Sequence, residues 1–150
     1  MKVNLKKSKI HNVKFGKNVT VIEPVNLYDC KILDNCFIGP FVEIQSNVII
    51  GKNTRVQSHS FICSNVKIGS DCFIGHGVKF INDKFIDSKI IKNKKLLLKT
   101  NIGNKVLIGS NATIMPVKIE DGVVIGAGSV VTKNCKKENI YFGNPAKKNN

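Results

Sequence analysis

The sequence predicts an all-β protein folded as a parallel β-helix, and two regularities carry this prediction. An aliphatic residue returns every six positions over most of the chain, and a small or β-branched residue follows it four positions later. A period of six matches neither an α-helix nor a simple alternating strand. It matches a short strand and a turn, repeated three times around a triangular coil of roughly 18 residues.

The aliphatic series runs unbroken through the middle of the chain and resumes after an interruption. If each coil takes about 18 residues, aliphatic residues of successive coils would stack in columns, with Ile38, Val56 and Ile74 one above another in the core. The series is loose at Phe15, Val21 and Leu27, continues as Ile32, Ile38, Ile44, Ile50, Val56, Ile62, Ile68, Ile74 and Phe80, and resumes as Ile102, Ile108, Ile114, Ile119, Ile125 and Val131.

The small positions predict a crowded inward slot, because β-branched residues fit the pleated surface of a strand. Cys36, Cys72 and Cys135 fall in this slot, where a thiol acts as a small apolar group. The five cysteines form no CxxC pair, so we expect reduced thiols and no metal. The slot residues are Cys36, Val42, Val48, Thr54, Ser60, Val66, Cys72, Val78, Val106, Ala112, Val123, Ser129 and Cys135.

The repeat stops between Asp83 and about Thr100. We therefore expect one domain, residues 1–150, with an inserted loop at 83–100 and a C-terminal tail at 136–150. A long loop in a solenoid is typical of a functional arm, and its lysines suit phosphate groups; a tolerated insertion with solvated charges is the alternative. Two corners, from Leu27 to Ile32 and from Ile114 to Ile119, are one residue short, and local distortion is expected there.

The strongly positive net charge does not by itself identify the binding partner. Lys and Arg number 24 against 10 Asp and Glu, a formal net charge of +14 that suits a nucleic acid, a membrane surface or a small polyanion, or that reflects compositional bias. No aromatic-basic platform supports nucleic-acid binding. The first residues show no apolar h-region of the kind a signal peptide has, and no apolar stretch approaches roughly 20 residues. We therefore expect neither nucleic acid nor membrane as a partner, and a cytoplasmic location.

Three segments in order, residues 108–116, 124–133 and 143–147, resemble the hexapeptide-repeat acyltransferases. With residues 75–83 the chain resembles more narrowly the N-acetyltransferases of nucleotide-linked 3-amino sugars, which include dTDP-3-amino-3,6-dideoxyhexose and UDP-linked 3-amino-glucuronate enzymes. The resemblance implies a left-handed parallel β-helix and a homotrimer with active sites between neighbouring subunits. It also implies acetyl-CoA as donor, a nucleotide-linked amino sugar as acceptor, and a role in surface glycan biosynthesis such as lipopolysaccharide or O-antigen.

The resemblance also assigns residues. Asn82 would contact the sugar amine or the thioester. Ser110 and Ala127 would lie along the pantetheine arm of CoA. The other residues it assigns to CoA are Thr132 and Lys133, near the nucleotide end, and Asn144 and Pro145, in the exit turn with Gly143. The residues expected to contact the acceptor are Asp83, Lys84, Phe80 and His59.

Amide formation from a thioester needs a neutral amine, a path for its proton and donors for the oxyanion. His11 lies in the irregular first coil, so His76 and His59 are the candidate bases, and His76 is preferred because its hexad precedes Asn82. A turn-exposed histidine without a catalytic role is the alternative, since the amine can arrive deprotonated and be oriented by Asn82. Asp83 would accept a proton, bind the ammonium, or cap the loop.

The sequence departs from the family pattern at two places, and three rival functions have to be compared with the acyltransferase interpretation. Lys84-Phe85-Ile86-Asp87 replaces the usual aromatic-Pro-Arg segment, and Val117 follows Pro116 where relatives carry glycine. O-acetyltransferases of this fold usually have Thr-His-Pro where this chain has Asn82-Asp83, which favours an amine acceptor. A zinc carbonic anhydrase would need three clustered histidines, which this sequence does not offer. A non-enzymatic scaffold would not explain the three segments.

Overall fold

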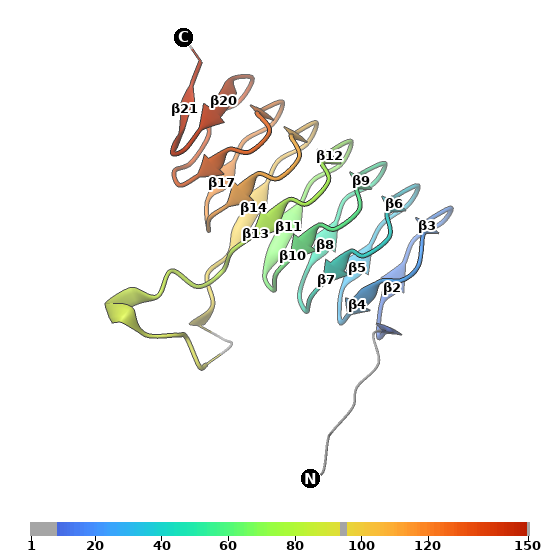
Figure 1. Ribbon diagram of the computed structural model, residues 1–150. Helices are drawn as coiled ribbons and strands as arrows, with labels where there is room; N and C mark the ends of the chain where they lie inside the picture. The colour runs from blue at the N-terminus through green and yellow to red at the C-terminus, as the bar shows by residue number, and fades with distance from the viewer. Residues whose placement is uncertain (1–8, 94–95, 150) are drawn as a thin grey trace.

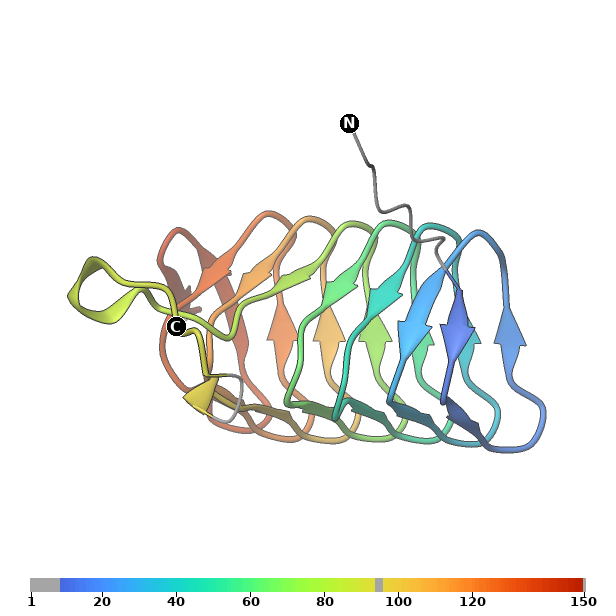
Figure 2. The same cartoon turned by 90° about the horizontal axis from the view of Figure 1, so that it is seen from below.

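The computed structural model describes residues 9–93 and 96–149, which form a parallel β-helix (Figure 1). Short strands line three sheets, one on each side of a triangular prism, and the successive coils lie side by side in Figure 2. The described residues contain no α-helix, and a short 3-10 turn, η1 (Ile86–Ser88), follows β13. Nowhere in the described ranges is a helix long and apolar enough to cross a membrane. The predicted fold class is confirmed.

The chain visits the three sheets in turn. Sheet A contains β1 (Ile10–His11), β4 (Asn26–Tyr28), β7 (Glu43–Ile44), β10 (Phe61–Ile62), β13 (Lys79–Phe80), β16 (Thr113–Ile114) and β19 (Val130–Val131). Sheet B contains β2 (Lys14–Phe15), β5 (Lys31–Ile32), β8 (Ile49–Ile50), β11 (Val66–Ile68), β14 (Thr100–Ile102) and β17 (Lys118–Ile119). Sheet C contains β3 (Thr20–Val21), β6 (Phe37–Ile38), β9 (Arg55–Val56), β12 (Phe73–Ile74), β15 (Leu107–Ile108), β18 (Val124–Ile125), β20 (Ile140–Gly143) and β21 (Ala146–Lys148).

The predicted columns form the core. In sheet C, Ile38 pairs with Val56, Val56 with Ile74 and Ile74 with Ile108, and all four side chains are fully buried. The slot residues are also buried. Phe15 differs, with 43% of its surface exposed, because β2 is the end strand of sheet B among the residues that the structure describes.

Polar ladders hold the corner between sheets B and C. The side-chain amides of Asn18, Asn35 and Asn53 each donate to the next residue of the ladder, which ends at Asp71, at 3.2, 3.1 and 2.9 Å. All four residues have positive φ, a conformation that Asn and Asp tolerate better than other residues with a side chain. The turn position of the hexad therefore carries Asn or Asp for a conformational reason.

The short corner between Ile114 and Ile119 leaves the sheets undisturbed. Ile119 still pairs with Ile102 in parallel register. The equivalent six-residue corners place Asn47 and Asn65 at positive φ, whereas residues 115–118 contain no positive-φ residue. The missing residue is thus absorbed in the turn.

The inserted loop spans residues 81–99 between β13 and β14, close to the predicted bounds, and projects away from the coils (Figures 1 and 2). The C-terminal tail forms the antiparallel hairpin β20–β21, and Asn144 and Pro145 make its turn. The hairpin packs on the last coil, where the Gly143 N–H donates to Ser129 Oγ at 3.1 Å.

Candidate functional site

The predicted site residues lie mostly on two corners of the prism. The CA corner is where the chain passes from sheet C into sheet A, at residues 39–42, 57–60, 75–78, 109–112 and 126–129. The AB corner is where it passes from sheet A into sheet B, at residues 45–48, 63–65, 81–99, 115–117 and 132–134. Sheet A separates the two corners.

The CA corner brings His76, Ser110 and Ala127 into one column. The His76 carbonyl accepts a hydrogen bond from the N–H of Asn111, which follows Ser110, at 2.8 Å. The Ser110 carbonyl accepts one from the N–H of Gly128, which follows Ala127, also at 2.8 Å. These three residues therefore occupy the same turn position in three successive coils, as expected for residues serving one site.

His76 has a defined partner and an exposed ring. Its Nδ1 lies 2.8 Å from Ser58 Oγ, one coil below. In the tautomer with the proton on Nδ1, the ring donates to Ser58 and leaves the Nε2 lone pair for a substrate proton. The geometry thus suits a general base at an open corner.

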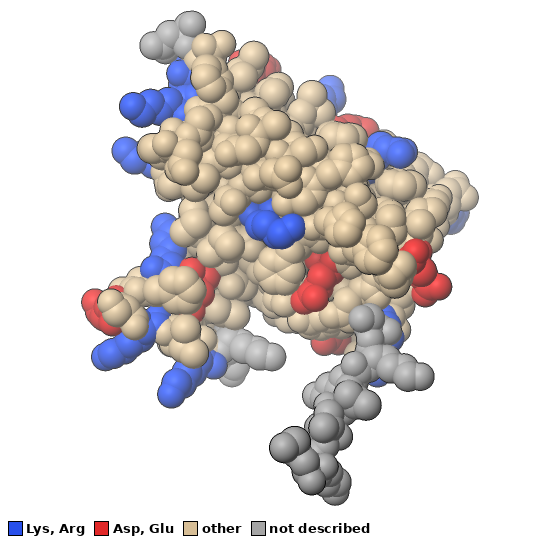
Figure 3. Space-filling view, viewed as in Figure 1, with Lys and Arg blue, Asp and Glu red and all other residues tan. Residues whose placement is uncertain are grey.

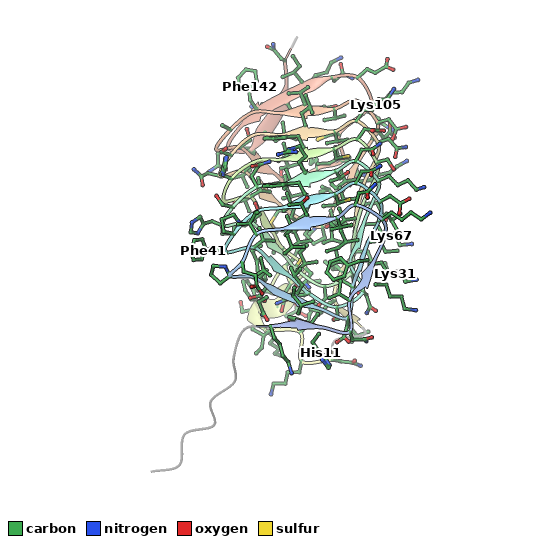
Figure 4. All side chains as sticks on the ribbon, turned by 90° about the vertical axis from the view of Figure 1, so that its right-hand side faces the viewer. His11, Lys31, Phe41, Lys67, Lys105 and Phe142 are labelled. Atoms are coloured by element: carbon green, nitrogen blue, oxygen red, sulfur yellow. The ribbon has the colours of Figure 1, made fainter. Side chains whose placement is uncertain are left out.

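His59 is engaged differently. Its ring stacks on Phe41, with centroids 4.7 Å apart and planes 16° from parallel. Figure 4 shows Phe41 at this edge of the prism. The backbone carbonyl of His59 accepts a hydrogen bond from Lys79 Nζ at 2.6 Å. The stacked ring makes His59 a weaker candidate base than His76.

Lys79 is a functional candidate that was not predicted from the sequence. Its ammonium group also donates to the Gly77 carbonyl at 3.2 Å, next to His76. The side chain is exposed on β13. The sequence feature that could have identified Lys79 is its outward-facing position in the same hexad as His76.

Ser110, Ala127 and Gly128 form a smooth edge along the CA corner. Ala127 and Gly128 are exposed, and Ser110 is half-buried. A Cβ placed on Gly128 would meet no atom within 4 Å, so open space lies beside it. Small residues with accessible backbone suit a narrow, flexible ligand such as a pantetheine arm. The hairpin turn at Asn144 and Pro145 follows Gly143, whose N–H donates to Ser129 at the CA corner of the last coil.

The AB corner holds Asn82 at the root of the loop. Its side-chain amide donates to the Ser64 carbonyl at 3.2 Å, and its own carbonyl accepts from the Leu98 N–H at 3.0 Å. Asn82 is half-buried and fixed between the outgoing and returning ends of the loop.

Asp83 shapes the loop. One carboxylate oxygen accepts from the Phe85 N–H at 2.8 Å and the other from the Ile91 N–H at 2.7 Å. Both oxygens are therefore occupied by loop backbone, which fits the capping alternative for this residue. Lys84 beside it is exposed on the loop.

Thr132 and Lys133 also lie on the AB corner and are exposed. The predicted CoA contacts are therefore divided, with Ser110 and Ala127 on one side of sheet A and Thr132 and Lys133 on the other. His76 and Asn82 are divided in the same way. The five residue-to-residue steps from Gly77 to Asn82 span about 17 Å of extended chain.

Phe80 lies in the core and not in the candidate site. Its ring is fully buried among the aliphatic residues of the core, on the inner face of β13. The expected contact with the acceptor is wrong, because the hexad that makes Phe80 a column residue also points it away from any ligand.

The cysteines offer no nucleophile. All five are buried, and burial raises the pKa of Cys30 and Cys135 to about 11 and that of Cys63 to about 12. Burial also raises the pKa of Cys36 and Cys72. Among the residues with defined positions, no group of three or more His, Cys, Asp and Glu could hold a metal ion.

Two family models match parts of the chain. Residues 29–64 match the bacterial transferase hexapeptide, and residues 99–133 match the hexapeptide repeat of succinyl-transferase. Both matched segments thus carry hexapeptide repeats.

More particularly, the chain is similar to acyltransferases. A probable macrolide acetyltransferase of Lysinibacillus sphaericus is 55% identical over 49 residues, which are 32% of this chain and 27% of that protein. The chain therefore spans about a quarter of the length of this curated relative.

Two solved structures share the fold. AntD, an N-acyltransferase from Bacillus cereus, was solved as a mutant with dTDP and coenzyme A; it has a TM-score of 0.82, is 22% identical, and the match covers 91% of this chain and 82% of that one. A mutant of perosamine N-acetyltransferase from Caulobacter crescentus, with CoA and GDP-perosamine, has a TM-score of 0.66 and is 16% identical, with 95% and 58% covered.

Proposed function

We propose that the protein is an acetyl-CoA-dependent N-acetyltransferase of the 3-amino group of a nucleotide-linked amino sugar, with a dTDP-3-amino-3,6-dideoxyhexose as the acceptor and surface glycan biosynthesis as its role. A UDP-linked 3-amino sugar is the alternative acceptor. The observation that carries the proposal is the column of His76, Ser110 and Ala127 on one open corner. The likeness of the fold to AntD, a structure holding dTDP and coenzyme A, supports it.

The proposed reaction is amide formation, with His76 as the general base. The amine nitrogen attacks the thioester carbonyl, and its proton passes to His76 Nε2 while Ser58 holds the other ring nitrogen. The C–N bond forms, the C–S bond breaks, and the proton leaves with the thiol. The pantetheine arm would lie along Ser110 and Ala127, so that backbone N–H groups of this glycine-rich edge are available to the oxyanion.

A second copy of the chain would complete this site. Proton transfer requires contact at about 3 Å, whereas sheet A keeps His76 and Asn82 apart in one protomer. In a homotrimer, the CA corner of one protomer and the AB corner of its neighbour would meet across the interface. Asn82 and the loop would then come from one protomer, and His76 with Ser110 and Ala127 from the other.

Sheet C offers an apolar face for this assembly. Phe73, Leu107 and Ile140 point outward with 38%, 46% and 47% of their surfaces exposed. Phe73 pairs with Leu107, Leu107 with Val124, and Val124 with Ile140, so the four residues form one stripe. On the side of the molecule seen in Figure 3, Lys and Arg gather along the edge that runs from the C-terminal end to the loop. An exposed apolar stripe of this kind is typical of an interface.

The proposal is tested by thiol release from acetyl-CoA followed by mass spectrometry. The acceptors are a dTDP-3-amino-3,6-dideoxyhexose, a UDP-linked 3-amino sugar and a 4-amino sugar. Turnover with one 3-amino sugar, strongly reduced in Asn82→Ala, is the expected result. Failure of the purified protein to bind CoA would overturn the acyltransferase proposal.

O-acetylation of a sugar or antibiotic hydroxyl is the second candidate, favoured by the 49-residue match to a macrolide acetyltransferase. Asn82-Asp83 stands against it, because neither residue supplies the imidazole that deprotonates a hydroxyl in the Thr-His-Pro pattern. Thiol release with a hydroxyl acceptor but with no amine would establish this alternative.

A further inference from the structure

A polar groove lies beside the root of the loop and outside the CA corner. It has a volume of about 320 Å³ and is lined by Asn47, Asn65, Lys67, Lys99 and Asn101. Lys67 and Asn101 are paired on adjacent strands of sheet B, β11 and β14, and both are exposed. Figure 4 shows Lys67 on the side of the prism away from Phe41, which marks the CA corner.

The lining is cationic, and hydrogen bonds hold two of its three side-chain amides in place. Neither Lys67 nor Lys99 forms an ion pair with any residue that the structure describes. Asn47 donates to Asn65 Oδ1 at 3.4 Å, and Asn65 donates to the Leu97 carbonyl at 3.2 Å. Two unpaired ammonium groups beside fixed amides are the chemistry that binds a multiply charged oxyanion, such as a diphosphate.

The groove adjoins the residue assigned to the acceptor amine. The Asn82 amide contacts the carbonyl of Ser64, whose neighbour in the chain is Asn65. The Asn82 carbonyl accepts from the Leu98 N–H, and Lys99 follows Leu98. Consecutive Cα atoms are about 3.8 Å apart, so the groove begins one residue away from each contact of Asn82. A sugar joined to a diphosphate can span this separation.

We infer that the groove binds the diphosphate of the nucleotide-linked sugar, with Lys67 and Lys99 contacting its oxygens and the sugar extending toward Asn82. This inference rests on the proposed function for the identity of the ligand. It assigns the acceptor's phosphates to the outer face of sheet B and the return end of the loop, whereas the acyl donor lies along the CA corner.

The competing explanation is diffuse attraction by a row of lysines. Lys14, Lys31, Lys67 and Lys118 all occupy the outward position of sheet B. Lys14 lies three strands from Lys67, about 14 Å away. That distance exceeds the screening length of about 8 Å at physiological ionic strength, so Lys14→Ala is a matched control for charge removed from the same face outside the groove.

The test is calorimetric titration of the full chain with inorganic pyrophosphate, dTDP and CoA separately. We expect Lys67→Ala and Lys99→Ala each to weaken pyrophosphate and dTDP binding about tenfold, and the double variant about a hundredfold, whereas Lys14→Ala stays within about twofold. CoA affinity should not change in any of these variants.

Unchanged dTDP and pyrophosphate affinity in the double variant would overturn the inference, as would equal weakening by Lys14→Ala. These outcomes are distinct from failure of the proposed function, which appears as loss of CoA binding or of thiol release in the unmodified protein. The lysines are exposed, and the thermal unfolding midpoint of each variant checks that folding is intact.

Discussion

Ser58 and His76 stand 18 residues apart in the sequence and form a side-chain hydrogen bond, with 2.8 Å between Ser58 Oγ and His76 Nδ1. The bond joins two successive coils at the CA corner and fixes the ring that faces the proposed amine. His76→Gln should lower kcat by a factor of about 10² to 10⁴, the usual contribution of a general base. Thiol release under saturating acceptor measures the effect.

Ser58 acts as a positioning residue in this scheme. Ser58→Ala should lower kcat about tenfold with little change in KM, and Ser58→Thr, which keeps the hydroxyl, should restore it. His59→Gln is the control, because the His59 ring stacks on Phe41 instead. If His76→Gln retained more than half of the activity, the amine would have to arrive deprotonated and rely on orientation alone.

The apolar stripe of sheet C predicts which substitution would disrupt the proposed homotrimer. Leu107→Lys places a charge between Phe73 and Val124 and should prevent the proposed trimer from forming, because a buried unpaired charge costs several kcal/mol. Ile49→Lys, on the outward face of sheet B, is the matched control and should remain trimeric. Size-exclusion chromatography with light scattering measures both, and a trimeric Leu107→Lys variant would place the interface elsewhere.

The hexad predicts most of the fold because each strand contributes one inward residue. Ile38, Val56 and Ile74 could be placed in one column from spacing alone, since parallel coils stack in register. The same spacing placed Phe80 in the core, yet resemblance placed it at the acceptor, and the core position prevailed. When a family motif includes a residue of the aliphatic series, the six-residue period shows that this residue points into the core and not toward a ligand.

The division of the site between two corners was harder to predict. His76 and Asn82 are six residues apart, which is one full side of the prism, so proximity in sequence places them on different corners. The partners of Asp83 depend on how the loop folds back at Ile91, and no periodicity governs that segment. The hydrogen bonds of Lys79 to His59 and Gly77 likewise depend on contacts between coils.

Gly51 and Gly128 provide a matched pair for stability. A Cβ on Gly51 would collide with the backbone carbonyl of Gly69 in the next coil, which cannot move without disturbing the stack. Gly51→Ala should therefore lower the free energy of unfolding by about 3 kcal/mol or more. Gly128→Ala has open space but a φ of 67°, so strain should cost it only about 1 kcal/mol. Urea unfolding midpoints compare the two, and equal losses would contradict the close approach of the coils at Gly51.

The buried thiols predict a loss of stability at alkaline pH. Burial raises the pKa of Cys63 from 9.0 to about 12, whereas the unfolded chain keeps the ordinary value. Below pH 9 the thiol is protonated in both states and has no effect. Between pH 9 and 12 the unfolded state loses the proton first, so the free energy of unfolding falls by about 1.4 kcal/mol per pH unit for this thiol. Urea unfolding of the unmodified protein and of Cys63→Ala from pH 8 to 11 measures the difference: the slope should be shallower in the variant, and identical slopes would mean that the Cys63 thiolate is tolerated in the core.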